Sequence, residues 1–171
     1  MNVAILTISD RSARGEREDR SGPALEKRIA VQGWRLVRSA VVADEREAIE
    51  RSLRDWSDSG AVDLILTTGG TGFSPRDLTP EATLAVVDRL APGMVEAMRA
   101  FSLKLTPHAM LSRALAGIRG KTLVVNLPGN PRAAVENLEV ILPALPHAIQ
   151  MLNDDPDSEA GHQPPRPTAS A

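Results

Sequence analysis

The sequence predicts one α/β domain in which a mostly parallel sheet is covered by helices on both faces, a three-layer α/β/α arrangement. Short apolar segments alternate with longer amphipathic segments along the 171 residues, a pattern typical of strands joined by helical crossovers. A chain of this length favours one domain. Hydrophobic residues make up 42% of the chain but aromatic residues only 2%, so aliphatic side chains must fill the core.

The first half of the chain alternates between strands and helices. Apolar runs that enter polar loops predict buried strands, and apolar residues at helical spacing predict the helices. Ser21 is a candidate N-cap, and Asp44, with Glu47 three residues later, resembles a capping box. The predicted order is strand 3–8, a mobile loop over 12–20, a helix from Ser21 to Gly33, strand 35–42, a helix from Asp44 to Gly60 and strand 62–66.

The second half is expected to continue the sheet and to finish on a long helix. Two short apolar runs flank Gly120 and predict a pair of strands. Two prolines around Gly129 and Asn130 predict a rigid turn, with Asn130 as the cap of the last helix. The predicted order is helix 79–90, helix 92–105, strands 114–118 and 122–126, turn 127–131 and helix 132–152.

The composition changes at the end of that helix. Residues 153–171 are rich in Asp, Pro, Ser, Gln and Gly, and such a segment buries too little apolar surface to offset its ordering entropy. We therefore expect a folded domain over residues 1–152 and a disordered tail over 153–171.

Charge and residue usage exclude several classes of protein. The formal net charge is −2 and aromatic residues are few, which argues against a nucleic-acid partner. The chain has no cysteine, so it has no disulfide, thiolate nucleophile or cysteine-based zinc site. The apolar N-terminus is too short for a membrane span and lacks a basic leader. These features predict a cytoplasmic protein without a membrane partner.

Four polar segments follow predicted strands of the sheet. They are Ser9 with Asp10, Asp44, the glycine loop 69–72, and the turn 127–131. Ligands of open α/β sheets bind beyond the carboxyl ends of the strands. The four segments are therefore expected to converge on one site.

The glycine loop, Thr68-Gly69-Gly70-Thr71-Gly72, is the centre of that expected site. Glycines allow positive φ and close approach to a ligand, and exposed N–H groups form a nest for anions. The loop is neither a Walker A motif nor the dinucleotide-binding fingerprint. The alternative is a tight strand-to-helix turn that binds nothing.

Asp44 and Asp77 follow neighbouring strands and have two interpretations. Each one alone reads best as a helix cap, or, for Asp77, as a salt-bridge partner of Arg76. Together they predict a Mg²⁺ site, since Mg²⁺ favours one or two carboxylates with substrate phosphates and water. The first loop contains four arginines, Arg11, Arg14, Arg17 and Arg20. They either make this a solvated charged loop or bind phosphate as a clamp. The three histidines, His108, His147 and His162, have no metal-ligand spacing and receive no role.

These motifs together resemble the molybdopterin adenylyltransferase family, which includes the bacterial MogA and MoaB proteins and the gephyrin G domain. The resemblance spans roughly residues 2–152 and is most specific over 64–83, which reads Leu-Ile-Leu-Thr-Thr-Gly-Gly-Thr-Gly-Phe-Ser-Pro-Arg-Asp-Leu-Thr-Pro-Glu-Ala-Thr. The other matching segments are 6–10, 21–23, 42–45, 106–113 and 126–131. Ala43 departs from the pattern, because many relatives have proline before the aspartate.

The resemblance implies a function and a set of site residues. It implies a MogA-like fold and the transfer of AMP from ATP to the phosphate of molybdopterin, with Mg²⁺ as cofactor and release of pyrophosphate. Asp44 and Asp77 match the two aspartates that bind metal and serve catalysis, and Thr71, Ser112 and Asn126 match pterin-pocket positions. The remaining expected substrate- and nucleotide-binding residues are Thr7, Ser9, Asp10, Ser21, Gly69, Gly70, Gly72, Pro128, Gly129, Asn130 and Pro131.

The expected partners include further copies of the chain. Apolar residues surround much of helix 92–105, more than one sheet face needs. The alternative is a helix buried deeply in its own subunit. The resemblance favours a homo-oligomer, expected as a trimer with a hexamer as the alternative, and it leaves open a separate molybdate-insertion protein. The competing function is a catalytically inactive trimeric scaffold that binds molybdopterin, and a third is a nucleotide-binding protein with another acceptor.

Overall fold

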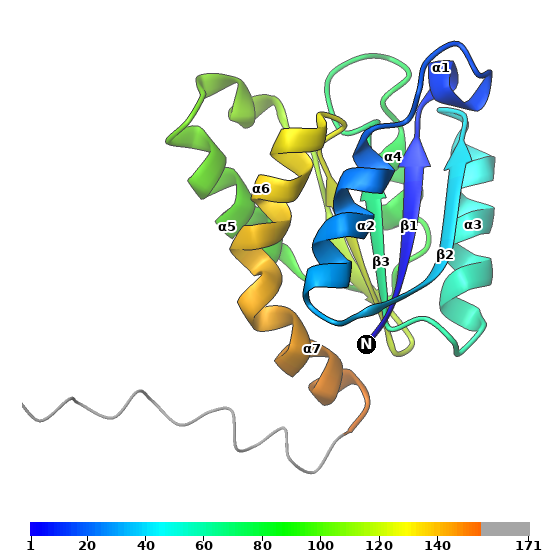
Figure 1. The fold of residues 1–171 in the computed structure, drawn as a ribbon, viewed down its shortest axis with the longest axis vertical. Helices are drawn as coiled ribbons and strands as arrows, with labels where there is room; N and C mark the ends of the chain where they lie inside the picture. Colours follow the sequence, from blue (N-terminus) through cyan, green and yellow to red (C-terminus); the bar gives the residue numbers. More distant parts are fainter. Residues whose placement is uncertain (155–171) are drawn as a thin grey trace, which may run out of the picture.

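A computed structural model describes residues 1–154, and its centre is a six-stranded sheet in the order β2-β1-β3-β6-β5-β4 (Figure 1). The first four of these strands are parallel, while β5 is antiparallel to β6 and β4 is antiparallel to β5. The expected mostly parallel sheet is confirmed. The strands are β1 Asn2–Ile8, β2 Arg35–Val42, β3 Leu64–Thr68, β4 Arg89–Leu90, β5 Ala116–Arg119 and β6 Thr122–Leu127.

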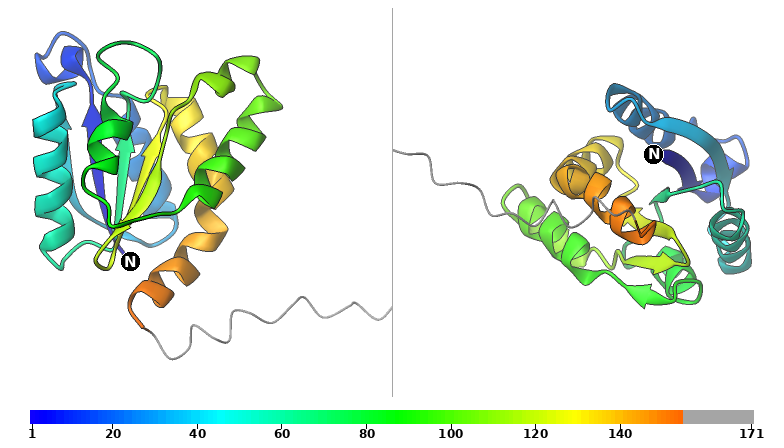
Figure 2. Two further views of the ribbon diagram at one scale, coloured as in Figure 1. Left: turned by 180° about the vertical axis from the view of Figure 1, so that it is seen from behind. Right: turned by 90° about the horizontal axis from the view of Figure 1, so that it is seen from below.

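Helices cover both faces of the sheet, as the alternation of segments predicts (Figures 1 and 2). The α-helices are α1 Asp10–Ala13, α2 Ser21–Val31, α3 Arg46–Asp58, α4 Thr79–Leu84, α5 Pro92–Leu103, α6 Pro131–Ile141 and α7 Leu145–Leu152. Two 3₁₀ helices complete the set, η1 Pro107–Leu111 and η2 Leu142–Ala144. None of the helices within residues 1–154 has the length and apolar character needed to cross a bilayer.

The two faces of the sheet support two separate cores. Along β1, Val3 and Ile5 point to the side of α2, α5, α6 and α7, while Ala4, Leu6 and Ile8 point to the side of α3 and α4. This two-residue alternation is the geometry of a strand that is buried on both faces. The sheet is thereby fixed from both sides, so the loops at its carboxyl edge stand on a rigid base.

Two predicted helices are wrong in their extent. The helix expected over 79–90 ends at Leu84, because Val86 turns into the core and residues 89–90 instead pair with β5. The helix expected over 132–152 divides into α6, η2 and α7. Pro143 lies at that division, and proline has no N–H to continue a helix and clashes with the preceding turn.

Two predicted caps are also wrong, and one is confirmed. The N-cap position of α2 is Arg20 and not Ser21, and Asp19 Oδ1 accepts from the backbone N–H of Ser21 at 2.9 Å and of Gly22 at 3.1 Å. The N-cap position of α3 is Glu45 and not Asp44. Asn130 caps α6 by accepting from Ala133 N at 3.1 Å, as predicted.

The predicted mobile loop lies within the described residues, whereas most of the predicted disordered tail does not. Within the loop expected over 12–20, the chain first completes α1, whose N-cap Ser9 accepts from Ser12 N at 3.2 Å. At the other end, α7 finishes at Leu152, where the predicted domain ends. The expected disordered tail, 153–171, lies outside the described residues from 155 onward.

Candidate functional site

The four predicted polar segments lie together at the carboxyl edge of the parallel strands. Ser9 N donates to Val42 O at 2.9 Å and joins the ends of β1 and β2. Gly69 N donates to Leu127 O at 3.3 Å, and Thr68 Oγ1 donates to Pro128 O at 2.7 Å. These bonds fix the glycine loop against the turn 127–131, so the loop ends of four parallel strands form one continuous surface.

The glycine loop is a tight turn held by the protein itself. Gly69 and Gly70 have φ of +100° and +63°. A Cβ on Gly69 would overlap the carbonyl oxygen of Ile8, and one on Gly70 would overlap Thr79 Oγ1. Thr79 closes the turn, because its Oγ1 donates to Gly69 O at 2.9 Å and its N–H donates to Gly70 O at 3.1 Å. Internal packing therefore already requires both glycines, whatever ligand the loop holds.

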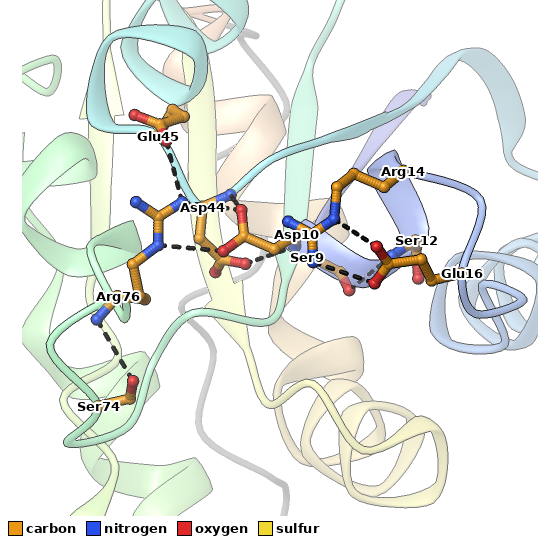
Figure 3. Close-up of polar contacts among 9 residues, drawn as sticks. All are labelled: Ser9, Asp10, Ser12, Arg14, Glu16, Asp44, Glu45, Ser74 and Arg76. Atoms are coloured by element: carbon orange, nitrogen blue, oxygen red, sulfur yellow. Dashed lines mark hydrogen bonds and ion pairs between the residues drawn. The ribbon is translucent and has the colours of Figure 1, made fainter.

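Asp10 and Asp44 hold each other in place through their backbones (Figure 3). Asp10 N donates to Asp44 Oδ2 at 2.7 Å, and Asp44 N donates to Asp10 Oδ1 at 3.0 Å. Arg76 donates to the Asp10 carboxylate from Nε to Oδ2 at 3.0 Å and from Nη2 to Oδ1 at 2.8 Å. Its Nη2 also donates to Glu45 Oε1 at 2.9 Å. The ends of β1 and β2 are thus tied to the loop that follows β3.

The two carboxyl groups have opposite electrostatic environments. The hydrogen bond from Arg76 lowers the pKa of Asp10. Burial raises the pKa of Asp44, and the negative charges of Asp10 and Asp77 add to that effect. Asp44 forms no ion pair with any residue in the described range. A half-buried carboxylate near two like charges is stabilised in its ionised form by a nearby cation.

Asp77 lies in the segment between the glycine loop and α4. Its Oδ2 accepts from Ser74 N at 2.8 Å, and a Cβ on Gly72 would lie 2.9 Å from the same oxygen. The expected salt bridge with Arg76 is absent from the described contacts, since Arg76 pairs with Asp10 and Glu45 instead. Asp77 is thereby left near enough to Asp44 to influence its pKa.

A polar cavity of about 420 Å³ opens between these loops. Of the predicted residues, its lining includes Thr7, Ser9, Ser21, Asp44, Gly69, Gly70, Asp77, Gly129, Asn130 and Pro131. Two arginines of the first loop, Arg17 and Arg20, also line it, which favours the phosphate-clamp interpretation for these two. Asp10, although predicted as a binding residue, does not line this cavity and instead forms hydrogen bonds with Asp44.

A second, mostly apolar cavity of about 310 Å³ lies on the other side of the glycine loop. The predicted residues that line it are Thr71, Gly72, Ser112, Asn126 and Pro128. Val95, Met98 and Arg99 of α5 form another wall that the sequence did not suggest. The residues expected for the pterin pocket therefore do lie around one cavity.

Several of the predicted site side chains form hydrogen bonds within the protein. Thr7 Oγ1 donates to Asp19 Oδ2 at 2.8 Å, and Ser21 Oγ donates to Gly129 O at 2.7 Å. Asn126 is fully buried; its amide donates to two threonine hydroxyls at 2.9 Å and accepts from Leu115 N at 3.1 Å. These residues shape the walls of the cavities rather than offering free donors.

Arg113, to which the sequence analysis assigned no role, holds the glycine loop in place. Its N–H donates to Thr71 O at 2.9 Å, its Nε donates to Gly72 O at 2.7 Å, and its guanidinium also holds Asp77 O and Glu81. The pKa of Glu81 is lowered by this pairing. Asp19, whose carboxylate accepts from the first two N–H groups of α2, is the second residue missed, although its place two residues before Ser21 was a usable signal.

Comparisons with known proteins agree with the fold. Residues 4–147 match the family described as "probable molybdopterin binding domain". The chain is 43% identical over 154 residues to a molybdopterin adenylyltransferase of Helicobacter pylori, with 89% of this chain and 88% of the relative covered. It is 45% identical over 166 residues to a gephyrin of Dictyostelium discoideum, but spans only 23% of that protein's length. The solved structure of the molybdopterin biosynthesis enzyme MoaB from Thermus thermophilus superposes with a TM-score of 0.85 at 48% identity, covering 91% of this chain and 98% of the other.

Proposed function

The chain belongs to the molybdopterin-binding family that matches residues 4–147, and from that premise we propose that it is a molybdopterin adenylyltransferase of molybdenum-cofactor biosynthesis. Its relatives at 38–43% identity over most of the chain carry that name. The predicted family and fold are thereby confirmed. In this reaction AMP passes from ATP to the phosphate of molybdopterin, and pyrophosphate is released.

One observation carries the proposal: the glycine loop separates two cavities of different chemistry. Gly69, Gly70, Asp44 and Asp77 line the polar cavity, and Thr71 and Gly72 line the apolar cavity. The turn 127–131 divides in the same way, with Pro128 on the apolar side and Gly129 onward on the polar side. A flat heterocycle and a polyphosphate fit these two environments, so their reacting groups would meet at the loop.

The chemistry needs little from the protein beyond placement. An oxygen of the molybdopterin phosphate attacks the α-phosphorus of ATP and forms a new P–O bond. The bond from that phosphorus to the oxygen bridging to the β-phosphate breaks, and pyrophosphate leaves with the electron pair. Backbone N–H groups of the glycine loop, Arg17 and Arg20 would hold the phosphates, and positioning and charge stabilisation carry most of the rate.

Mg²⁺ fits the acidic residues of the polar cavity. Within residues 1–154 no three acidic or histidine side chains cluster so as to hold a metal by themselves. Asp44 and Asp77 line the cavity together with Glu18 and Asp19. Mg²⁺ takes a pair of carboxylates such as Asp44 and Asp77 when substrate phosphates and water complete its shell. When bound, the ion would neutralise charge on the ATP phosphates, and Asp44 and Asp77 would hold it.

Assembly and location belong to the same proposal. On α5 and the segment after it, Phe101, Leu103 and Leu105 are 37%, 42% and 58% exposed, so the helix is not buried deeply in its own subunit. We propose that this surface packs against further copies of the chain in a homo-oligomer, expected as a trimer. A cytoplasmic site of action, and a molybdate-insertion step on another chain, complete the proposal.

The test is an assay of the purified protein with molybdopterin, ATP and Mg²⁺. We expect an adduct of pterin and AMP by mass spectrometry, with one pyrophosphate released per adduct. Tight pterin binding without any adduct would instead favour the scaffold function. ATP turnover that does not require pterin, in a protein that purifies without pterin fluorescence, would favour another acceptor.

A further inference from the structure

Both oxygens of the Asp10 carboxylate already accept hydrogen bonds from the protein. Its Oδ1 accepts from Asp44 N at 3.0 Å and from Arg76 at 2.8 Å, and its Oδ2 accepts from Arg76 Nε at 3.0 Å (Figure 3). It also lies outside the lining of the polar cavity. A carboxylate whose two oxygens both accept hydrogen bonds from the protein is a poor candidate for contact with substrate or metal.

Asp44 has the opposite arrangement. Its Oδ2 accepts from Asp10 N at 2.7 Å, whereas no described contact engages Oδ1, which would lie 3.3 Å from a Cβ on Gly70. One oxygen is therefore anchored on Asp10 while the other points to the glycine loop and the polar cavity. Both backbone and side chain of Asp44 depend on the position of Asp10.

We propose that Asp10 and Arg76 are positioning residues for Asp44, acting as a chain from Arg76 through Asp10 to Asp44. Arg76 ties the loop after β3 to the end of β1, and Asp10 then sets both the backbone and the carboxylate of Asp44 at the end of β2. This inference rests on the proposed function. It assigns Asp10 a different role from the direct substrate contact that the sequence suggested.

The exposure of Arg76 argues against a role in overall stability. Its side chain is 50% exposed and that of Asp10 is 24% exposed, and ion pairs of this kind contribute little to folding because solvent screens them. A planar guanidinium that holds both oxygens of one carboxylate does, however, fix orientation. The pair is therefore better suited to setting the direction of a neighbouring group than to holding the fold.

The main variant is Arg76→Gln, and the chain offers a matched control. Arg14 and Glu16 form a similar two-nitrogen pair in the first loop, at 2.7 Å and 3.0 Å, without touching Asp44. Arg14→Gln removes the same charge and the same kind of pair. We expect kcat for adenylyl transfer to fall by about tenfold to a hundredfold in Arg76→Gln, the cost of a small misplacement of a catalytic group. KM for molybdopterin and the melting temperature should match those of Arg14→Gln.

Two further measurements separate positioning from direct contact with ATP. Calorimetry with a non-cleavable ATP analogue should show that Arg76→Gln loses the increment in affinity that Mg²⁺ gives, while affinity without Mg²⁺ is retained. In the double variant with Asp44→Asn, turnover should fall no further than in Asp44→Asn alone, because both changes interrupt one chain. Arg76→Lys, which keeps the charge without the planar fork, should restore kcat only in part.

Each alternative result has a distinct meaning. Independent, multiplicative losses in the double variant, or a loss of analogue affinity without Mg²⁺, would overturn the proposal and make Arg76 a direct phosphate ligand. Equal kcat in Arg76→Gln and Arg14→Gln would also overturn it. Failure of the wild-type protein to adenylylate molybdopterin would reject the proposed function instead, and the calorimetric comparison would still test the link from Arg76 to Asp44.

Discussion

Replacing Gly70 by alanine separates the structural requirement of the glycine loop from its role in ligand binding. Gly70 has φ of +63°, and a Cβ there would overlap Thr79 Oγ1 and approach Asp44 Oδ1 to 3.3 Å. Thr79 is fully buried, and its hydroxyl donates to Gly69 O. The new methyl group must therefore displace a buried hydrogen bond beside an aspartate of the proposed site.

The magnitude follows from two contributions to the free energy of unfolding. A non-glycine residue in the left-handed region costs roughly 1–2 kcal/mol. Displacing Thr79 Oγ1 leaves the buried carbonyl of Gly69 poorly satisfied, which costs roughly 1–3 kcal/mol. Together Gly70→Ala should lower the free energy of unfolding by about 2–5 kcal/mol.

Gly60→Ala is the control, because Gly60 has φ of +67° and no atom within 4 Å of an added Cβ. Gly60→Ala carries only the backbone contribution, so chemical denaturation should show that it lowers the free energy of unfolding less than Gly70→Ala does. The difference between the two variants then measures the packing around Thr79. Equal losses would refute the steric argument. A Gly70→Ala protein of wild-type stability with weakened ATP and molybdopterin binding would mean that the loop relaxes easily and that its glycine serves the ligand alone.

Three other predictions follow from the site and the surface. Asp77→Asn should keep the fold but lower turnover by a large factor, since the amide still accepts from Ser74 N and only the charge is lost; unchanged turnover at saturating Mg²⁺ would remove Asp77 from the mechanism. Asp44→Asn should melt at a higher temperature than wild type at neutral pH. The raised pKa of Asp44 means that ionisation destabilises the fold above the folded-state pKa, and this gain should vanish as pH falls below the unfolded value of about 4. Sedimentation at micromolar concentration should show a homo-oligomer, and a single species near the 18.3 kDa chain mass would contradict the proposed assembly through α5.

The sequence predicted the sheet and the place of the site because both depend on local patterns. Apolar runs define buried strands, and parallel strands must end at one edge, so Asp44 and the glycine loop were expected to meet. Helix ends were less predictable, because they depend on tertiary contacts. Nothing local shows that Val86 turns into the core and that residues 89–90 pair with β5.

The partners of the arginines were also beyond sequence reasoning. Arg76 is adjacent to Asp77, so a local salt bridge was the simplest expectation, yet its partner Asp10 lies 66 positions away. Arg113 holds carbonyl oxygens of the glycine loop about 40 positions earlier. Carbonyl groups have no sequence signature, and a side chain that binds them can be recognised only once the fold has placed them together.

The balance of charge at the carboxyl edge links stability to function. Asp10, Asp44 and Asp77 lie close together there, and of these three only Asp10 forms an ion pair with an arginine within the described residues. Asp44 is half-buried, and this partial burial, together with the neighbouring negative charges of Asp10 and Asp77, raises its pKa. The folded protein therefore loses stability by keeping Asp44 ionised at neutral pH. A protein selected for stability alone would favour a neutral side chain at this position. The carboxylate of Asp44 is explained if a cation that accompanies ATP offsets its negative charge. The charge that lowers the stability of the free protein would then contribute to binding the cation.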